Sequence, residues 1–149
     1  MSGGRRWGPA LVLALAAAGC GGSANTSAHQ LRDDAGRVCA VATQRLNAIH
    51  TPQVPSQGMA FLRSGIAALR PEVAALAPMH PEGAAGVHFR AARTATEQEL
   101  KTLQSSLKGL QAGNDPIVAF KTLQAQLAPL ETRATSAWRA MNVPACAKT

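Results

Sequence analysis

The stretch MAFLRSGIAALRPEVAAL, residues 59–76, carries the pattern that decides the fold of this chain. Its apolar side chains recur at alternating steps of three and four residues: Met59, Leu62, Ile66, Leu69, Val73 and Leu76. This spacing places them along one face of a helix, as in the helices of a bundle. Pro71 lies inside the stretch, and the spacing continues in phase beyond it. The sequence therefore predicts one helix that is kinked at Pro71.

Three further segments repeat this spacing, and prolines and glycines separate the four. The expected helices cover residues 30–49, 56–77, 81–112 and 116–141. None of them alternates apolar and polar residues at the two-residue period of a strand. Short connections between consecutive helices make neighbours antiparallel. We therefore expect residues 30–149 to form an all-α domain, an up-down-up-down four-helix bundle.

Local signals in the connections predict the helix boundaries. Ser56 is expected to cap the second helix, because a serine oxygen can accept from the free N–H groups of a first turn. Gly113 suits the left-handed position that follows a helix, and Asp115 before Pro116 is a typical helix start. Pro129 lies within the fourth helix, so we expect this helix to be kinked as the second one is.

The first twenty residues have the layout of a bacterial lipoprotein signal. Arg5 and Arg6 precede an apolar run over residues 11–19, and the run ends at Cys20. The run is shorter than the roughly 20 apolar residues that cross a bilayer, and it fits the apolar region of a secretory signal. We expect residues 1–19 to be a lipoprotein signal peptide.

This interpretation makes Cys20 the lipidated first residue of the mature chain. Residues 20–29 then form a flexible tether rich in small residues. Two or more acyl chains anchor a protein stably, so we expect the domain at the extracytoplasmic face of the cell membrane. The alternative is an ordinary signal peptide that is cut after Ala18 and leaves Cys20 as a free thiol.

The charge of the chain is positive but dispersed. Residues 1–19 hold two of the 15 basic residues, so 13 basic and all 8 acidic residues lie beyond them. Nucleic-acid surfaces need a clustered basic stripe, usually with aromatic side chains for stacking. The four aromatic residues of the expected domain are all predicted to be buried: Phe61, Phe89, Phe120 and Trp138. We therefore expect no nucleic-acid partner.

The chain has three cysteines, an odd number. If Cys20 carries lipid, Cys39 and Cys146 remain as a pair. Disulfides persist in the oxidising compartment that export implies, so we expect these two cysteines to be bonded. The bond would close most of the domain into one loop, which the chain-entropy model values at about 4–5 kcal/mol. The alternative is two buried thiols.

No sequence motif of a metal or catalytic site is present. The histidines His29, His50 and His80 are expected at the surface or at helix ends, and His88 lies off the apolar stripe of its helix. None of the four belongs to an HxxxH or HExxH pattern. CxxC, CxxCH, GxSxG and phosphate-loop patterns do not occur either. We expect no metal, no cofactor and no enzymatic activity.

The eight carboxylates do not form the pattern of a di-iron bundle, because no glutamate has a histidine three residues further on. Glu72 and Glu131 each closely follow an internal proline. We expect them to pair with nearby arginines such as Arg70 and Arg133 on a solvated face.

The region 31–147 resembles a diffuse set of uncharacterised small α-helical lipoproteins of high-GC bacteria. The shared features are a lipidation motif, a cysteine in the first helix, here Cys39, and a cysteine near the C-terminus, here Cys146. The second helix ends in the shared Leu-x-Pro pattern as Leu76-Ala77-Pro78, and the turn before the fourth helix reads Gly113-Asn114-Asp115. The resemblance implies a helical domain and carries no assigned activity.

Together these features predict a lipid-anchored protein of the cell envelope that acts as a non-catalytic binding or interaction module. A groove formed at the kinks of Pro71 and Pro129 would bind a partner protein of the envelope. The alternative is a carrier of a small molecule or lipid. Alanine and glycine in the helix seams would then leave a cavity between the helices.

Overall fold

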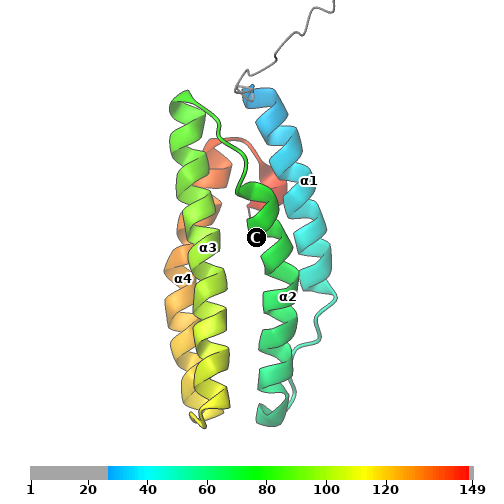
Figure 1. The fold of residues 1–149 in the computed structure, drawn as a ribbon, viewed down its shortest axis with the longest axis vertical. Helices are drawn as coiled ribbons and strands as arrows, with labels where there is room; N and C mark the ends of the chain where they lie inside the picture. Colours follow the sequence, from blue (N-terminus) through cyan, green and yellow to red (C-terminus); the bar gives the residue numbers. More distant parts are fainter. Residues whose placement is uncertain (1–26, 148–149) are drawn as a thin grey trace, which may run out of the picture.

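The computed structural model describes residues 27–147, and this part of the chain is helical (Figure 1). The four α-helices are α1 Ala28–Asn47, α2 Gly58–Leu76, α3 Gly83–Gln111 and α4 Pro116–Ala140. Two short 3-10 turns accompany them, η1 Pro55–Gln57 and η2 Pro144–Cys146. No strand occurs between residues 27 and 147. The expected all-α fold with four helices is confirmed. The expected signal peptide, Cys20 and most of the tether lie outside the described residues.

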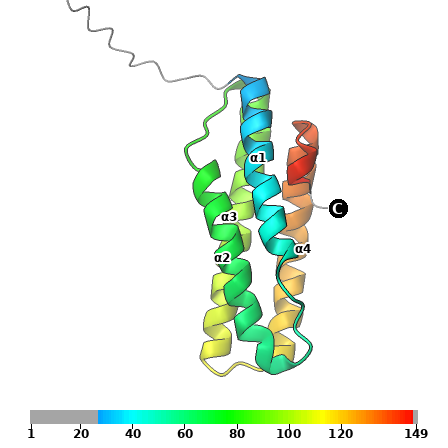
Figure 2. The same ribbon diagram turned by 90° about the vertical axis from the view of Figure 1, so that its right-hand side faces the viewer.

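The helices lie side by side along the long axis of the molecule (Figures 1 and 2). The most extensive packing is between α3 and α4, followed by α2 against α3 and α1 against α2. These contacts are those of a helical bundle. α1 also packs against η2, but the described residues show no comparable contact between α1 and α4.

Helix α1 begins two residues earlier than the periodicity predicts. The Ser27 hydroxyl accepts from the backbone N–H of Gln30 at 3.2 Å, and the Gln30 side chain accepts from the Ser27 N–H at 3.3 Å. This reciprocal pair satisfies two free donors of the first turn. His29 therefore lies on the helix and not in the tether, with its Nδ1 2.9 Å from Asp33.

Two other helix starts were expected from single residues. Asp115 caps α4 as predicted, since its carboxylate accepts from the N–H of Val118 at 2.9 Å. The expected cap at Ser56 is wrong: Ser56 belongs to η1, and α2 begins at Gly58 without a side-chain cap. Pro55 explains the difference, because its fixed φ suits the first position of a helical turn and starts η1 there.

The internal prolines do not end their helices. Pro71 lies inside α2 and Pro129 inside α4, and each helix is continuous through its proline. Gly113 takes φ +91° after α3, as the left-handed position after a helix requires.

One half of the bundle has a closed core. Phe89 of α3 and Trp138 of α4 are almost fully buried, and their rings meet edge to face with centroids 5.9 Å apart. Leu31 and Ala35 of α1 complete this cluster together with the residues around η2. All four helices contribute to it, so α1 covers this half of the bundle.

The other half has smaller apolar clusters, and a polar layer separates them from the closed core. Leu62, Leu110 and Leu123 form one cluster, while Ile66, Leu69 and Leu100 form another. The buried polar residues are Glu72, Thr96 and Glu99. Along α2 and α3 they fall between the residues of the closed core and those of the smaller clusters.

Helix α1 is too short to cover this second half. At 1.5 Å per residue, its 20 residues span about 30 Å, while the 29 residues of α3 span about 43 Å. Beyond Asn47 the chain continues as a non-helical linker, residues 48–54, which runs along the bundle to η1 (Figures 1 and 2). The apolar faces of α2, α3 and α4 continue beyond the end of α1.

Candidate functional site

A groove of about 500 Å³ opens at the side of the bundle where α1 ends. Its walls come from all four helices and from the linker after α1. The lining residues are Leu46, Ile49, Thr51, Phe61, Leu62, Gly65, Leu69, Glu99, Leu103, Phe120, Leu123, Gln124, Leu127 and Glu131. Nine of these fourteen are Leu, Ile or Phe. This volume and this mostly apolar lining are typical of a small-molecule site.

The groove consists of seam residues that the bundle leaves incompletely covered. Six of its apolar side chains are only half-buried: Leu46, Ile49, Phe61, Leu103, Phe120 and Leu127. The helical spacing of these residues predicts core positions. Since α1 ends at Asn47, no fourth helix covers those of α2, α3 and α4. Phe61 and Phe120 are therefore not fully buried, which corrects the expectation from the sequence. Met59, at the start of the same seam, is exposed.

The two aromatic rings mark one end of the groove. The ring centroids of Phe61 and Phe120 are 6.3 Å apart. A Cβ at Gly58 would come within 2.6 Å of the Phe120 ring, so α2 starts in close contact with α4 at this end. A Cβ at Gly65, two turns further along α2, would meet no atom within 4 Å. Open space therefore lies beside Gly65.

Two carboxylates mark the other end of the groove. Glu99 of α3 is only 3% exposed and belongs to the polar layer, whereas Glu131 of α4 is exposed at the rim. None of the fourteen lining residues is Lys, Arg or His. The groove thus has carboxyl groups at one end and aromatic rings at the other.

A neighbouring hollow of about 670 Å³ lies between the linker and α2. It shares Ile49, Thr51 and Phe61 with the groove. Six of its eleven lining residues are polar: Arg45, His50, Thr51, Gln53, Gln57 and Ser64. This hollow is a surface depression beside the groove, with a lining of mixed polar and apolar residues.

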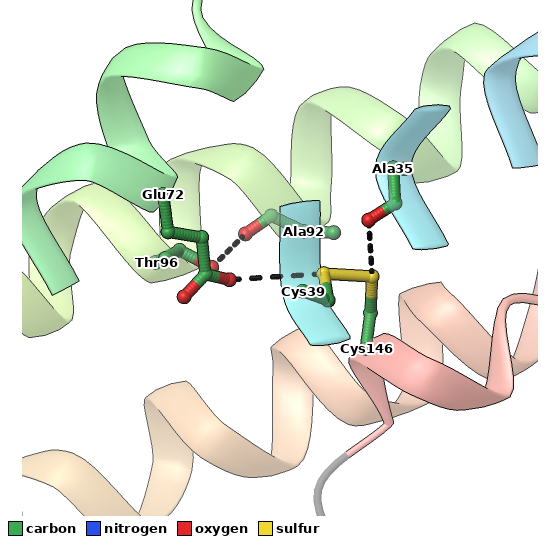
Figure 3. Close-up of a disulfide and its surroundings, with 6 residues drawn as sticks. All are labelled: Ala35, Cys39, Glu72, Ala92, Thr96 and Cys146. Atoms are coloured by element: carbon green, nitrogen blue, oxygen red, sulfur yellow. Dashed lines mark hydrogen bonds between the residues drawn. A yellow bond between two sulfur atoms is a disulfide. The ribbon is translucent and has the colours of Figure 1, made fainter. Parts of the chain in front are cut away.

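The two cysteines of the domain form a disulfide between α1 and η2 (Figure 3). Cys39 and Cys146 have their Cα atoms 5.0 Å apart and are 3% and 7% exposed. The pairing is the one that the cysteine count predicts. The Sγ of Cys146 lies 3.4 Å from the carbonyl oxygen of Ala35. A disulfide sulfur carries no hydrogen, so this approach is a packing contact and not a hydrogen bond.

Glu72 lies beside the disulfide, and this overturns the expectation of a solvated face. Its Oε1 is 3.8 Å from the Sγ of Cys39 (Figure 3), and its side chain is only 8% exposed. The sequence places Glu72 next to the seam residue Val73, but it does not show that Cys39 of α1 packs against this face of α2. Glu131, in contrast, is exposed as expected.

The histidines do not converge. His29, His50, His80 and His88 are all exposed. Across residues 27–147, no three His, Cys, Asp or Glu side chains gather in a group that could hold a metal ion.

Glu99 and the lining residues of the groove were not among the expected site residues, although a groove or a cavity between the helices was expected. For Glu99 a signal is present in the sequence: it lies three residues after Thr96 and four before Leu103, which are both positions of the α3 stripe. A carboxylate at such a position breaks an apolar seam. The early end of α1 is also visible, because no residue after Ile49 continues its spacing.

None of the helices in the described part of the chain is long and apolar enough to cross a membrane. Comparison of the chain with family models, curated proteins and solved structures gives no match. The resemblance to small helical lipoproteins thus stays a prediction, and the function has to be argued from the groove.

Proposed function

We propose that this chain is a lipid-anchored binding protein of the cell envelope that holds a small, largely apolar molecule in the groove beside the end of α1. The observation that carries the proposal is the set of half-buried seam residues in the groove, among them Leu46, Leu103 and Phe120. This choice favours the carrier, the alternative expected from the sequence, over a module that acts only through its surface.

The physical reason is the free energy of apolar surface. Each Å² of apolar area removed from water contributes about 25 cal/mol. A ligand in the groove would cover the exposed sides of Leu, Ile and Phe residues that the fold itself leaves in contact with water. A non-catalytic role fits this lining, which offers shape and apolar contact with few polar groups.

The location at the membrane rests on Cys20 and on the disulfide. Disulfides persist in exported proteins, so the Cys39–Cys146 bond supports an extracytoplasmic domain. Lipid on Cys20 would hold the groove close to a membrane. Labelling of cells with a palmitate analogue tests this anchor: the wild-type chain should be labelled, and the Cys20→Ser chain should not. Label on both chains, or on neither, contradicts it.

An up-down-up-down order of the helices is part of the proposal. The short connections of residues 77–82 and 112–115 favour it, and so does the colour sequence along the helices in Figures 1 and 2. Kinks at the internal prolines would act on the groove directly. Pro71 follows the lining residue Leu69, and Pro129 lies between Leu127 and Glu131.

A protein partner in the envelope is the second candidate. Ile117 and Val118, at the start of α4, are 59% and 61% exposed. Two adjacent apolar side chains are a smaller feature than the groove, because single exposed apolar residues are common. Pull-down from solubilised membranes should recover the same partner with wild-type protein and lose it with Ile117→Asp, if this surface binds one.

The groove is tested by titration with a neutral apolar dye such as Nile red. The protein is the chain from residue 20 onward with Cys20→Ser, which keeps every described residue. Gly65→Trp should fill the open space beside Gly65 and weaken dye binding at least about tenfold. Ala67→Trp adds the same bulk at an exposed position of α2 and should bind as wild type. Equal binding by both variants contradicts the proposal.

A further inference from the structure

The end of the bundle at which α2 and α4 begin lies opposite the start of α1 (Figures 1 and 2). A Cβ at Gly58, the first residue of α2, would come within 2.6 Å of the Phe120 ring of α4, so the two helix starts are adjacent. The turn η1 packs against both helices. We call residues 54–63 and 108–121, which form this end, the tip.

Exposed apolar side chains gather at the tip. The described residues include six large apolar side chains that are exposed, and four of the six belong to the tip: Val54, Met59, Ile117 and Val118. The other two are Val41 on α1 and Val87 near the start of α3. Single exposed apolar residues are common, but several at one end of a domain are typical of a contact surface.

Basic side chains lie directly behind two of these apolar residues. Arg63 follows Met59 by four positions on α2, and Lys121 follows Ile117 by four positions on α4. Residues at this spacing share one face of a helix and are about 6 Å apart along its axis. Both basic side chains are exposed. The tip therefore has apolar side chains at its outer edge and cations one helical turn further in.

The charge of the tip is positive. Its basic residues are Arg63, Lys108 and Lys121, and its only acidic residue is Asp115. The Asp115 carboxylate accepts from the backbone N–H of Val118 and caps α4. Apolar side chains flanked by Lys and Arg are typical of proteins that bind membrane surfaces, because the apolar groups enter the boundary between headgroups and acyl chains while the cations meet anionic headgroups.

The small size of the tip also favours a membrane over a protein. A specific protein interface buries about 800 Å² on each partner, which is more than four partly exposed side chains supply. A membrane surface needs no such fitted area, since each apolar group that enters it and each cation beside it contributes separately.

We propose that the tip binds the surface of an anionic lipid membrane. Met59, Ile117 and Val118 enter the boundary between headgroups and acyl chains, and Arg63 and Lys121 contact lipid phosphates. This contact is separate from the groove and from lipid on Cys20, so it does not rest on the proposed function.

The anchor proposed at Cys20 would determine how the bundle lies on the membrane. Residues 20–26 extend at most about 25 Å, while the 29 residues of α3 span about 43 Å. An anchored chain would therefore bring its tip to the same membrane with the bundle at a low angle to it. The contact at the tip would then fix the orientation of the domain.

Sedimentation with lipid vesicles tests the proposal, with the chain from residue 20 onward carrying Cys20→Ser. Vesicles of phosphatidylglycerol and phosphatidylcholine in equal parts should bind the protein at least about fivefold more tightly than vesicles of phosphatidylcholine alone. Added salt should reduce this difference. Absence of binding to the anionic vesicles, or equal binding to both kinds, overturns the proposal.

Two matched variants assign the contact to the tip. Ile117→Asp should weaken binding to anionic vesicles at least about tenfold, because it removes an apolar side chain and adds a negative charge. Val87→Asp changes the total charge equally and should bind as wild type. Val87 is 57% exposed against 59% for Ile117, and it lies at the other end of the bundle. Equal binding by both variants contradicts the assignment to the tip.

A second pair tests the cations. Lys121→Gln should weaken binding to anionic vesicles about fivefold. Lys101→Gln, at an exposed position of α3 outside the tip, should have a smaller effect. An equal loss in both would mean that the charge of the whole chain attracts the membrane, which overturns the role of the tip.

The same experiments separate the membrane from the protein partner considered above. If wild-type protein does not bind vesicles and Ile117→Asp loses an envelope protein in the pull-down, the surface binds a protein and the membrane proposal is wrong. Vesicle binding that Ile117→Asp alone weakens supports the membrane, whether or not the groove binds a ligand.

Discussion

Cys39 in α1 and Cys146 in η2 are 107 positions apart in the sequence, and a disulfide holds their Cα atoms 5.0 Å apart. The bond attaches the segment after α4 to the helix that covers only one half of the bundle. η2 packs against α1 at this point, and the bond belongs to the closed core. The closed half is thus covalently fastened, while the groove half is not.

The first prediction concerns this bond. A double Cys39→Ser, Cys146→Ser chain should lose about 4–5 kcal/mol of unfolding free energy, because the unfolded chain regains the entropy of a loop of roughly a hundred residues. Urea denaturation followed by circular dichroism measures the loss. Reduction of the wild-type chain should give a similar shift. An unchanged denaturation midpoint in both experiments would refute a stabilising role for the bond.

A second prediction compares two phenylalanines. Phe89→Ala should cost about 3–5 kcal/mol, because Phe89 is fully buried against Trp138. Phe61→Ala should cost clearly less, since Phe61 is only half-buried in the groove. The ligand affinity should show the reverse order, with the larger loss for Phe61→Ala. Equal costs in stability would mean that the two halves of the bundle are equally closed.

Two glycines provide a third prediction. Gly65→Ala should stabilise the protein by up to about 1 kcal/mol, because alanine favours the helix and its Cβ meets open space. Gly113→Ala should destabilise it, since Gly113 has φ +91°. Thermal denaturation of both variants gives the comparison. A lower melting temperature for Gly65→Ala would show that the space beside Gly65 is filled.

The caps provide a fourth prediction. Ser27→Ala and Asp115→Ala should each cost about 1 kcal/mol, because each removes the acceptor for a backbone N–H at a helix start. Asp115→Asn keeps an acceptor and should cost much less. Ser56→Ala serves as a control without a capping contact and should have little effect. A large loss of stability in Ser56→Ala would show that Ser56 does cap α2.

The helices and many of the buried positions could be predicted from the sequence. Steps of three and four residues identified Leu62, Leu69 and Leu76 as buried positions, and the Asp115-Pro116 pair placed the start of α4 correctly. These features are local, so a single segment contains the information. The cysteine pair also followed from a simple count.

The groove could not be predicted in the same way, because it depends on which helix ends where. The spacing places Phe61 and Phe120 on core faces, but only the arrangement of the helices shows that α1 leaves them uncovered. The burial of Glu72 was missed for a related reason: its position next to Cys39 depends on the packing of α1 against α2. Short-range patterns carry no information on such contacts.

The central claim is that the groove half of the bundle binds a small apolar molecule. Amide NMR spectra of the labelled chain with and without decanol test it most directly. We predict that the shifts concentrate at groove residues such as Leu46, Gly65 and Leu103. The amide signals of Ala35 and Trp138 in the closed core should not shift. Unchanged spectra at saturating decanol, or shifts that centre on the closed core, would contradict the claim.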